Sequence, residues 1–269
     1  MNSGLLAGKR GVVLGVANEK SIAWACARAC VDAGASLIFS YQGEVLEKRV
    51  GKLIETLPRP APMFPCDVGL DDEIEAFFLR VEEQWDSLDF VIHSLAFAEK
   101  DDLKNPFFQT PRANFAKALD ISAYSLVAVT RRAAPLFKHG GSIVAMTYYG
   151  AEKVVPHYNV MGVAKAALEM SARYLAVDLG PQNIRVNCVS AGPIRTLSAS
   201  AIPGMRQLLD VNQRVTPLRR NTDAEEVARS TVYLLSDLAS GVTGEVLHVD
   251  CGFHVLGLFA AEEEKELAE

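Results

Sequence analysis

Short apolar runs alternate with amphipathic stretches along the chain of 269 residues. The runs are short and rich in Val, Ile and Phe, which predicts buried strands, and the apolar spacing between them predicts helices. Seven strands are expected, at residues 10–16, 35–41, within 62–68, and at 88–94, 142–148, 184–190 and 245–250. Helices are expected at 21–33, 43–57, 71–85, 112–137, 160–179 and 223–235, with further helical turns at 198–213.

Strands that are apolar throughout and separated by helices indicate a parallel sheet that is covered on both faces. Right-handed crossovers make this an α/β fold of the Rossmann type, with a doubly wound seven-stranded parallel sheet and helices on both faces. Because no repeat or linker interrupts the pattern, residues 1–269 are expected to form a single domain. Residues 261–269, AEEEKELAE, are expected to be a solvated acidic tail.

Charge and composition narrow the range of partners. The net charge of −6 argues against nucleic acid, since a phosphate-binding surface needs an excess of Lys and Arg. No segment approaches the roughly 20 apolar residues that span a bilayer, and the first residues lack the pattern of a signal peptide. Neither a nucleic-acid partner nor a membrane location is expected.

The cysteines and histidines argue against disulfides and metal. The five cysteines are odd in number and form no CxxC pair, and Cys26 and Cys30 are expected to be buried side chains of one helix. The five histidines lack metal-ligand spacing, so no metal is expected. His93, at a strand end, is expected to be a structural hydrogen-bonding group. These features indicate a protein of the reducing cytoplasm.

The first turn from strand to helix is a candidate phosphate site, because ligands of such sheets bind at the carboxyl ends of the strands. Gly15 ends the strand and Ser21 opens the helix, whose first N–H groups can receive a pyrophosphate. The G-x-G-x-x-G fingerprint is absent, however. An ordinary turn with Ser21 as the helix N-cap is therefore an equally good interpretation.

The ends of the second and third strands bear on the choice of cofactor. Gln42 can hydrogen-bond ribose hydroxyls, and Glu44 and Glu47 disfavour an additional phosphate, so NADH is favoured over NADPH. The alternative is that Gln42 is only a loop residue. Asp67 closes the third strand, where its carboxylate can either reach an adenine amino group or cap the next helix.

The stretch MTYYGAEKVVPHYNVMGVAK holds the candidate catalytic groups. Tyr158 and Lys165 are seven residues apart at the entry to a helix, which is two turns, so both side chains lie on one face. The ammonium group is expected to favour the ionised form of the phenol, whose ordinary pKa is near 10, and to strengthen it as a donor. The alternative is surface decoration, but the position after the fifth strand favours catalysis.

The order of strand, Tyr-x6-Lys, strand and AGPIRT resembles the short-chain dehydrogenase/reductase superfamily. The chain departs from the ketoreductases of that superfamily, because Ala145 stands in place of their catalytic serine and HSLAFA (93–98) in place of NNAG. With GVANEKSIAWA, YQ, CDV, TYYGAE, YNVMGVAK and RVNCVSAGPIRTLSAS, it resembles the divergent branch, the enoyl-(acyl-carrier-protein) reductases of bacterial fatty-acid synthesis. The resemblance runs from about Leu6 to Phe253.

The resemblance implies roles for individual residues. It makes Tyr148, Tyr158 and Lys165 catalytic and places Ala98, Tyr148 and Tyr158 at the substrate. The implied contacts to NADH/NAD fall on Gly15, Ser21, Ile22, Gln42, Asp67, Val68, Leu95, Lys165, Ile194, Arg195, Thr196, Leu197 and Ser198. Ala96 stands where many relatives have Gly, beside the nicotinamide pocket, and DCG (250–252) replaces the more usual DGG.

The implied reaction is the NADH-dependent reduction of the trans-2 double bond of enoyl thioesters on acyl-carrier protein. Hydride goes to the β-carbon, and Tyr158 and a ribose hydroxyl are expected to stabilise the charge on the thioester oxygen. Lys165 orients the ribose. The enolate then takes a proton that comes ultimately from solvent, and no serine is needed because no alkoxide forms.

The resemblance further implies a homotetramer and a substrate flap at about 194–213, whose small residues suit a segment that orders on binding. An ordinary pair of surface helices is the alternative for that segment. Two other functions stay open, namely a 3-oxoacyl or other carbonyl reductase of the same fold and a non-catalytic NAD-binding paralogue. The missing serine argues against the first, and the intact Tyr148, Tyr158 and Lys165 argue against the second.

Overall fold

The computed structural model describes residues 4–196 and 203–257. Within these ranges seven parallel strands form one sheet in the order β3-β2-β1-β4-β5-β6-β7. The strands are β1 (Arg10–Leu14), β2 (Ser36–Tyr41), β3 (Met63–Pro65), β4 (Phe90–His93), β5 (Gly141–Thr147), β6 (Ile184–Ala191) and β7 (Val246–Val249). All seven predicted strands are present, and the predicted doubly wound Rossmann fold is confirmed.

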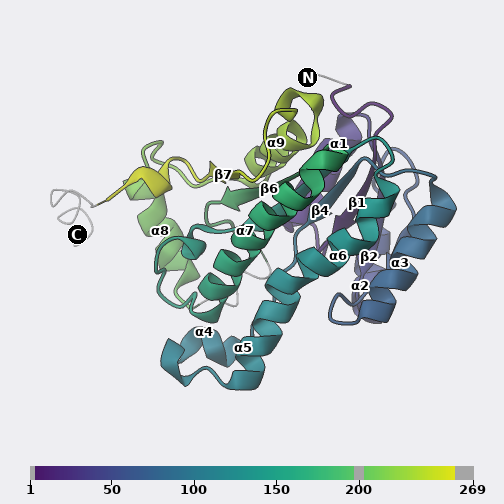
Figure 1. Cartoon of the computed structure of the whole chain (residues 1–269). Coiled ribbons are helices and arrows are strands. Elements are labelled where there is room, and N and C mark those ends of the chain that lie inside the picture. The colour runs from purple at the N-terminus through teal and green to yellow at the C-terminus, as the bar shows by residue number, and fades with distance from the viewer. Residues whose placement is uncertain (1–3, 197–202, 258–269) are drawn as a thin grey trace.

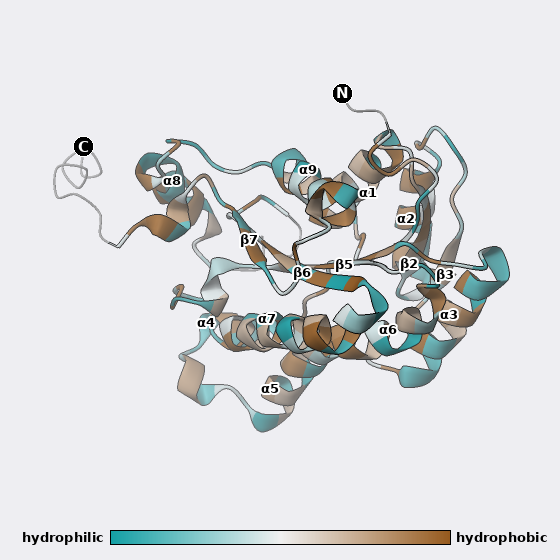
Figure 2. Cartoon of the chain, turned by 45° about the horizontal axis from the view of Figure 1, so that its top comes forward, coloured by the Kyte–Doolittle hydropathy of each residue, from teal (hydrophilic) through white to brown (hydrophobic). Residues whose placement is uncertain are grey.

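Helices cover both faces of the sheet, with α1, α2 and α9 on one side and α3, α6 and α7 on the other (Figure 1, Figure 2). Alternate strand residues point to opposite faces, so the neighbours Val12 and Val13 are fully buried in different cores. The helices are α1 (Ile22–Asp32), α2 (Gly43–Ile54), α3 (Asp71–Gln84), α4 (Lys100–Lys104), α5 (Arg112–Leu119), α6 (Ser125–Ala133), α7 (Val160–Leu179), α8 (Met205–Val215) and α9 (Ala224–Leu235).

The prediction of one continuous helix at 112–137 is wrong. α5 and α6 are separated by a π-helical turn, η2 (Asp120–Tyr124), of the kind that is frequent at functional sites. Within it the Ser122 hydroxyl accepts the Phe97 N–H at 2.9 Å and donates to the Phe97 carbonyl at 3.1 Å. This contact holds the loop after β4 against the helix, and no apolar periodicity could have indicated it.

Smaller differences have local causes. α4 was not expected, because KDDLK is too short and too polar to show helical periodicity. β1 ends before its predicted limit because Gly15 adopts a φ of 101° and turns the chain out of the ladder. The turns predicted at 198–213 correspond in part to α8, while 198–202 and the predicted tail at 261–269 lie outside the described residues.

All five thiols are free and buried, and Cys26 and Cys30 are among them as predicted. Burial raises the pKa of Cys26 to about 12, so its thiol stays protonated. Across residues 4–196 and 203–257, none of the helices combines the length and the apolarity that crossing a bilayer requires.

Gly11 tests how closely β1 and β4 pack. It is in register with Phe90, and a Cβ atom at Gly11 would lie 2.0 Å from Cε2 of that fully buried ring. We expect Gly11→Ala to lower the free energy of unfolding by about 1–3 kcal/mol, because the overpacked ring has to move. Denaturant melting followed by circular dichroism measures this change.

The matched control is Gly241→Ala. Gly241 is exposed, its φ lies outside the left-handed region, and none of the described non-neighbouring atoms lies within 4 Å of the new Cβ. This variant is expected to stay within about 0.5 kcal/mol of the wild type. An equal loss in both variants would contradict the packing argument.

Candidate active site

A cavity of about 490 Å³ lies at the carboxyl ends of β1 to β4. β1 runs between β2 and β4, so this is the point of strand-order reversal at which open α/β sheets bind ligands. Its walls include five of the predicted cofactor residues, Gly15, Gln42, Asp67, Val68 and Leu95. They also include Ala96 and residues that the sequence did not single out, such as Phe97, Lys117, Asp120 and Ile121.

Gly15 brings the end of β1 close to the end of β4. A Cβ atom at this position would lie 2.0 Å from the Ser94 carbonyl oxygen, and the φ of 101° is one that residues with side chains rarely adopt. The position therefore requires glycine for two reasons. The exposed backbone after β1 becomes part of the cavity wall.

Ser21 occupies the N-cap position of α1, but its side chain does not cap that helix. The Ser21 hydroxyl oxygen accepts the N–H groups of Ala17 at 3.1 Å and Asn18 at 3.0 Å. The N-cap interpretation of the side chain is therefore wrong, because the hydroxyl orders the preceding loop. Ile22, the first residue of α1, is half-buried.

Gln42 and Asp67 form one polar element of the cavity wall. The Gln42 amide donates to Asp67 Oδ2 at 2.7 Å, and Asp67 Oδ1 accepts the Gly69 N–H at 2.9 Å. α3 begins at Asp71 with Leu70 at its N-cap position, so the alternative that Asp67 caps this helix is wrong. Gln42 is likewise more than a loop residue, because it orients a carboxylate within the cavity wall.

The two candidate tyrosines lie together. Tyr148 follows β5 and Tyr158 precedes α7, and their rings pack edge to face with centroids 4.9 Å apart. Ala98 joins both tyrosines in an apolar cluster, whose other members are Leu103, Val155 and Met161. The structure thus brings together the three residues that were predicted at the substrate.

Lys165 is buried on α7, and its ammonium group donates to the carbonyls of Met146 at 2.7 Å and Leu95 at 3.4 Å. Burial lowers the pKa of Lys165 to about 8. Burial raises the pKa of Tyr158 well above its ordinary value, and Tyr148 acts in the same direction. The expectation that the ionised form of Tyr158 is favoured is therefore wrong, because burial raises the pKa of the phenol. Tyr158 is a neutral phenol that can donate a hydrogen bond.

Two residues that sequence reasoning missed hold Tyr158 in place. A Cβ atom at Gly150 would lie 2.4 Å from the Tyr158 ring, so only glycine fits there. Asn159 has a φ of 43° and donates to the carbonyls of Asp102 at 2.8 Å and Asn105 at 2.9 Å. The only signals in the sequence were the glycine of TYYGAE and an asparagine, a residue that tolerates positive φ, next to the tyrosine.

The predicted cofactor residues that follow β6 are described only in part. Ile194, Arg195 and Thr196 follow Gly192 and Pro193 outside regular secondary structure, and a hydrogen bond from the Thr196 N–H to the Ile194 carbonyl at 2.8 Å closes a γ-turn. None of the three lines the cavity at β1 to β4. Leu197 and Ser198 lie outside the described residues.

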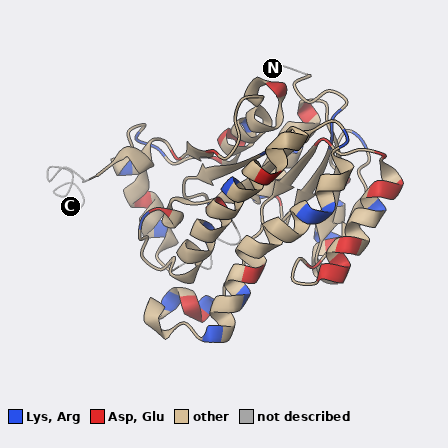
Figure 3. Cartoon of the chain, viewed as in Figure 1, with Lys and Arg blue, Asp and Glu red and all other residues tan. Residues whose placement is uncertain are grey.

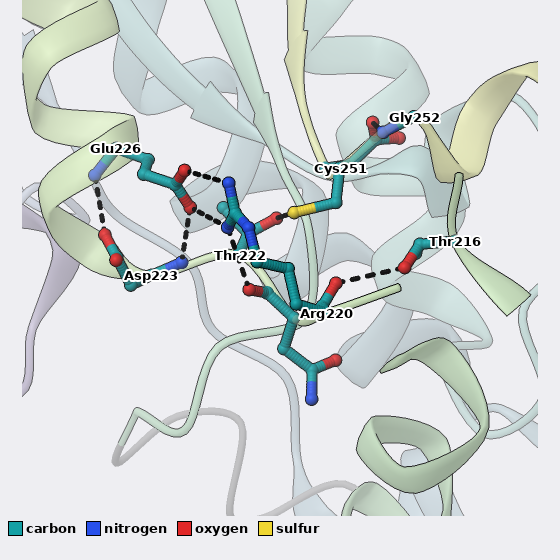
Figure 4. A network of polar contacts seen from close by, with 9 residues as sticks. Thr216, Arg220, Thr222, Asp223, Glu226, Cys251 and Gly252 are labelled. Atoms are coloured by element: carbon teal, nitrogen blue, oxygen red, sulfur yellow. Dashed lines mark hydrogen bonds and ion pairs between the residues drawn. The ribbon is translucent and has the colours of Figure 1, made fainter. Parts of the chain in front are cut away.

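A polar network anchors the segment between α8 and α9 (Figure 4). Arg220 donates to both carboxylate oxygens of Glu226 at 2.7 and 2.6 Å, and Glu226 forms a capping box with Asp223 at the start of α9. The Thr222 hydroxyl contacts the Cys251 thiol at 3.5 Å. Cys251 has a φ of 58°, a conformation that glycine adopts at lower cost than a residue with a side chain.

His93 ends β4 and is fully buried. The Ser125 hydroxyl donates to the Ile121 carbonyl at 2.7 Å, so the His93 Nε2–H donates to Ser125 at 2.8 Å. This contact agrees with the predicted structural role. Burial, and then the charge of Lys165, lower the pKa of His93 to about 3.

The buried His93 predicts acid sensitivity. The unfolded chain, with a histidine pKa near 6.5, binds more protons than the folded chain, so stability is full above that pH and falls as pH decreases toward 3. The contribution is up to about 1.4 kcal/mol per pH unit. Urea unfolding at pH values between about 7 and 5 measures the slope.

His93→Gln separates this effect from other acid-sensitive groups, because glutamine keeps a donor for Ser125 and does not titrate. The variant is expected to show a shallower loss of stability over the same pH range. Identical slopes for the wild type and the variant would rule out His93 as the titrating group.

Comparison with known proteins adds an independent observation. A family model described as Enoyl-(Acyl carrier protein) reductase matches residues 15–254. The enoyl-(acyl-carrier-protein) reductase (NADH) 1 of Rhizobium meliloti is 54% identical over 260 residues, which cover 97% of this chain and 95% of that protein.

Solved structures agree with this match. The enoyl-acyl carrier protein reductase of Bacillus cereus, crystallised with NADP+ and indole naphthyridinone, gives a TM-score of 0.94 at 51% identity and covers 95% of this chain and 100% of its own. The enzyme of Anaplasma phagocytophilum in complex with NAD gives 0.92 at 48% identity, with coverage of 97% and 98%. Fold, site and sequence agree over nearly the full length, and the chain belongs to the enoyl-(acyl-carrier-protein) reductase family.

Proposed function

We propose that this protein reduces the trans-2 double bond of enoyl thioesters on acyl-carrier protein, with NADH as hydride donor, in the elongation cycle of fatty-acid synthesis. The observation that carries the proposal is the packing of Tyr158 against Tyr148 next to the buried Lys165. Lys165 follows Tyr158 by seven residues and donates to the carbonyl of Leu95, which lines the cavity at β1 to β4, and this supports assigning the tyrosines and the cavity to one site. Membership of the family supports the same reaction.

The residues of the cavity fit a dinucleotide. Gln42 and Asp67 offer an amide and a carboxylate to the hydroxyl and amino groups of adenosine, and the negative charge of Asp67 disfavours an additional phosphate. Gly15 leaves the backbone open to close approach, and the ammonium of Lys165 suits ribose hydroxyls. The proposed contacts also include Ser21, Ile22, Val68, Leu95 and residues 194–198. NADH supplies the hydride when it is bound there.

Tyr158 is the proposed donor to the thioester oxygen, on which negative charge develops when the β-carbon accepts hydride. Burial keeps the phenol protonated, so Tyr158 can donate at neutral pH. A donor placed in this way contributes about 2.7–4 kcal/mol to transition-state stabilisation. Ala145, in place of a catalytic serine, offers no hydroxyl, which fits a reaction that forms an enolate and no alkoxide.

The partner in this proposal is acyl-carrier protein, which is acidic. Basic residues occur on α8 and on the segment that follows it (Figure 3). Arg206 and Arg214 belong to α8, whereas Arg220 is paired with Glu226. We infer that the segment at about 194–213 acts as a flap over the substrate, within a single domain that comprises the whole chain.

Tyr158→Phe tests the catalytic assignment. The variant keeps the ring packing and loses the hydroxyl, so the turnover of crotonyl thioester is expected to fall about 10²–10³-fold while NADH affinity stays unchanged. The measurement is steady-state NADH oxidation at 340 nm together with a fluorescence titration of NADH. Tyr149→Phe, which removes the hydroxyl of the neighbouring tyrosine that packs on Phe253, is the matched control and should retain turnover.

The same assay separates the alternatives. Faster turnover of acetoacetyl than of crotonyl thioester by the wild type would favour a carbonyl reductase. Tight NADH binding without turnover of any enoyl thioester would favour a non-catalytic paralogue. Normal turnover by Tyr158→Phe would remove the proposed donor.

We also propose a homotetramer, as the family resemblance implies. α7 carries exposed apolar side chains on one face at intervals of seven, four and three residues, Val163, Met170, Tyr174 and Val177. Such a stripe suits burial against another copy of the chain. Because this face points away from the sheet core, assembly through α7 leaves the cavity accessible.

Tyr174→Glu is expected to weaken this assembly by placing a charge in an apolar interface. Light scattering after size exclusion should give four times 29.2 kDa for the wild type and a smaller mass for the variant. Tyr233→Glu, on the half-exposed face of α9, is the matched control and should keep the wild-type mass. An unchanged mass for Tyr174→Glu would exclude the α7 face as an interface.

A further inference from the structure

Glu169 is a buried carboxylate that the proposed reaction does not use. It lies one helical turn after Lys165 on α7, and as whole residues Glu169 and Lys165 are 4% and 5% exposed. Glutamate is rarely buried to this degree unless it is paired. Glu169 is therefore expected to have a polar partner. It lies on the same helix face as Lys165, which raises the question of whether it acts on that lysine.

The side chains of Lys165 and Glu169 form hydrogen bonds to two consecutive residues of β5. Lys165 donates to the Met146 carbonyl at 2.7 Å, and the Thr147 hydroxyl donates to Glu169 Oε1, also at 2.7 Å. Tyr148 is the next residue along the chain. A pair of contacts one turn apart thus fixes α7, which carries Lys165, against the strand that leads into the tyrosine pair.

We propose that Glu169 is a positioning residue, whose negative charge keeps Lys165 in the ammonium form that binds the cofactor ribose. The inference rests on the proposed function, in which Lys165 holds the cofactor. Glu169 itself touches neither cofactor nor substrate in this proposal and acts through Lys165.

The electrostatic surroundings support this assignment. Burial lowers the pKa of Lys165 to about 8, and the carboxylate of Glu169 acts in the opposite direction. Cys188 of β6 faces the same space, but burial raises its pKa to about 12, so it is uncharged at neutral pH. His93 of β4 is neutral as well, because burial lowers its pKa to about 3. Glu169 is therefore the group whose ionisation can stabilise the ammonium.

The pKa of Glu169 is raised by burial, and the Thr147 hydroxyl acts in the opposite direction. The ionisable and charged groups that surround the Lys165–Glu169 pair come from α7, β4, β6, β7, the turn after β5 and the tyrosine pair. They are Arg173, His93, Cys188, His248, Glu152, Tyr148 and Tyr158.

The test is the pH dependence of NADH affinity between about pH 6 and pH 10, measured by fluorescence on the full chain. NADH affinity is expected to fall at high pH as Lys165 loses its proton, and this fall is the alkaline limb. The limb should vanish in Lys165→Met, which identifies it with Lys165. Glu169→Gln keeps an oxygen for Thr147 but removes the charge. We expect its limb to move down by about one pH unit, which at pH 8 corresponds to about a fivefold loss of affinity.

Three further variants separate charge from structure. Thr147→Val removes the hydrogen bond and keeps the carboxylate, and Glu152→Gln removes an exposed carboxylate that contacts His248. Both should keep the limb at the wild-type pH, although Thr147→Val is expected to melt at a lower temperature. Glu169→Met, which fills a similar volume without charge, replaces the amide variant if that variant does not fold.

An unmoved limb in Glu169→Gln, or an equal displacement in Thr147→Val, would overturn the inference in favour of a purely structural role. A wild type without the limb would overturn it too. The proposed function is judged separately, by wild-type turnover of an enoyl thioester. An enzyme that shows the limb and its displacement but turns over no enoyl thioester would refute the function and leave the role of Glu169 intact.

Discussion

Lys165 carries an amino group into the interior at the junction of α7, β5 and the loop after β4. Its hydrogen bonds to the carbonyls of Met146 and Leu95 replace part of the hydration that it loses, and burial still lowers its pKa. The rest of the site is arranged around this group. The loop after β4 has to stay within reach of the ammonium, and Ser122 of the π-helical turn holds that loop through Phe97.

Most of the fold followed from periodicity. A strand that is buried on both faces has to be apolar throughout, and a helix that covers one face has to repeat its apolar residues, so all seven strands and the main helices could be located. The prediction that Tyr158 and Lys165 lie two turns apart on one helix was wrong, because α7 begins at Val160 and Asn159, with a φ of 43°, separates Tyr158 from the helix. Placing cofactor contacts at Gly15, Gln42 and Asp67 relied on strand ends, which a parallel sheet collects at one edge.

What could not be predicted depends on contacts between distant segments. Nothing in the spacing of residues 112–137 shows that Ser122 bonds to Phe97 and interrupts the helix. Sequence reasoning likewise assigned Lys165 a direct effect on the Tyr158 phenol, although burial decides the pKa of both groups. The sequence analysis did not single out Glu169, because a glutamate four residues after a lysine on a helix is usually solvated.

The narrow space at Gly150 has a consequence for reshaping the pocket. Any side chain there would meet the ring of Tyr158 at 2.4 Å and that of Tyr148 at 3.3 Å, so the position is coupled to both phenols at once. Ala98 and Val155 already carry side chains and pack, half-buried, against the same cluster. Variant libraries designed to accept bulkier or branched acyl chains should therefore vary Ala98 and Val155 and keep Gly150. A methyl group at position 150 would displace the rings of Tyr158 and Tyr148.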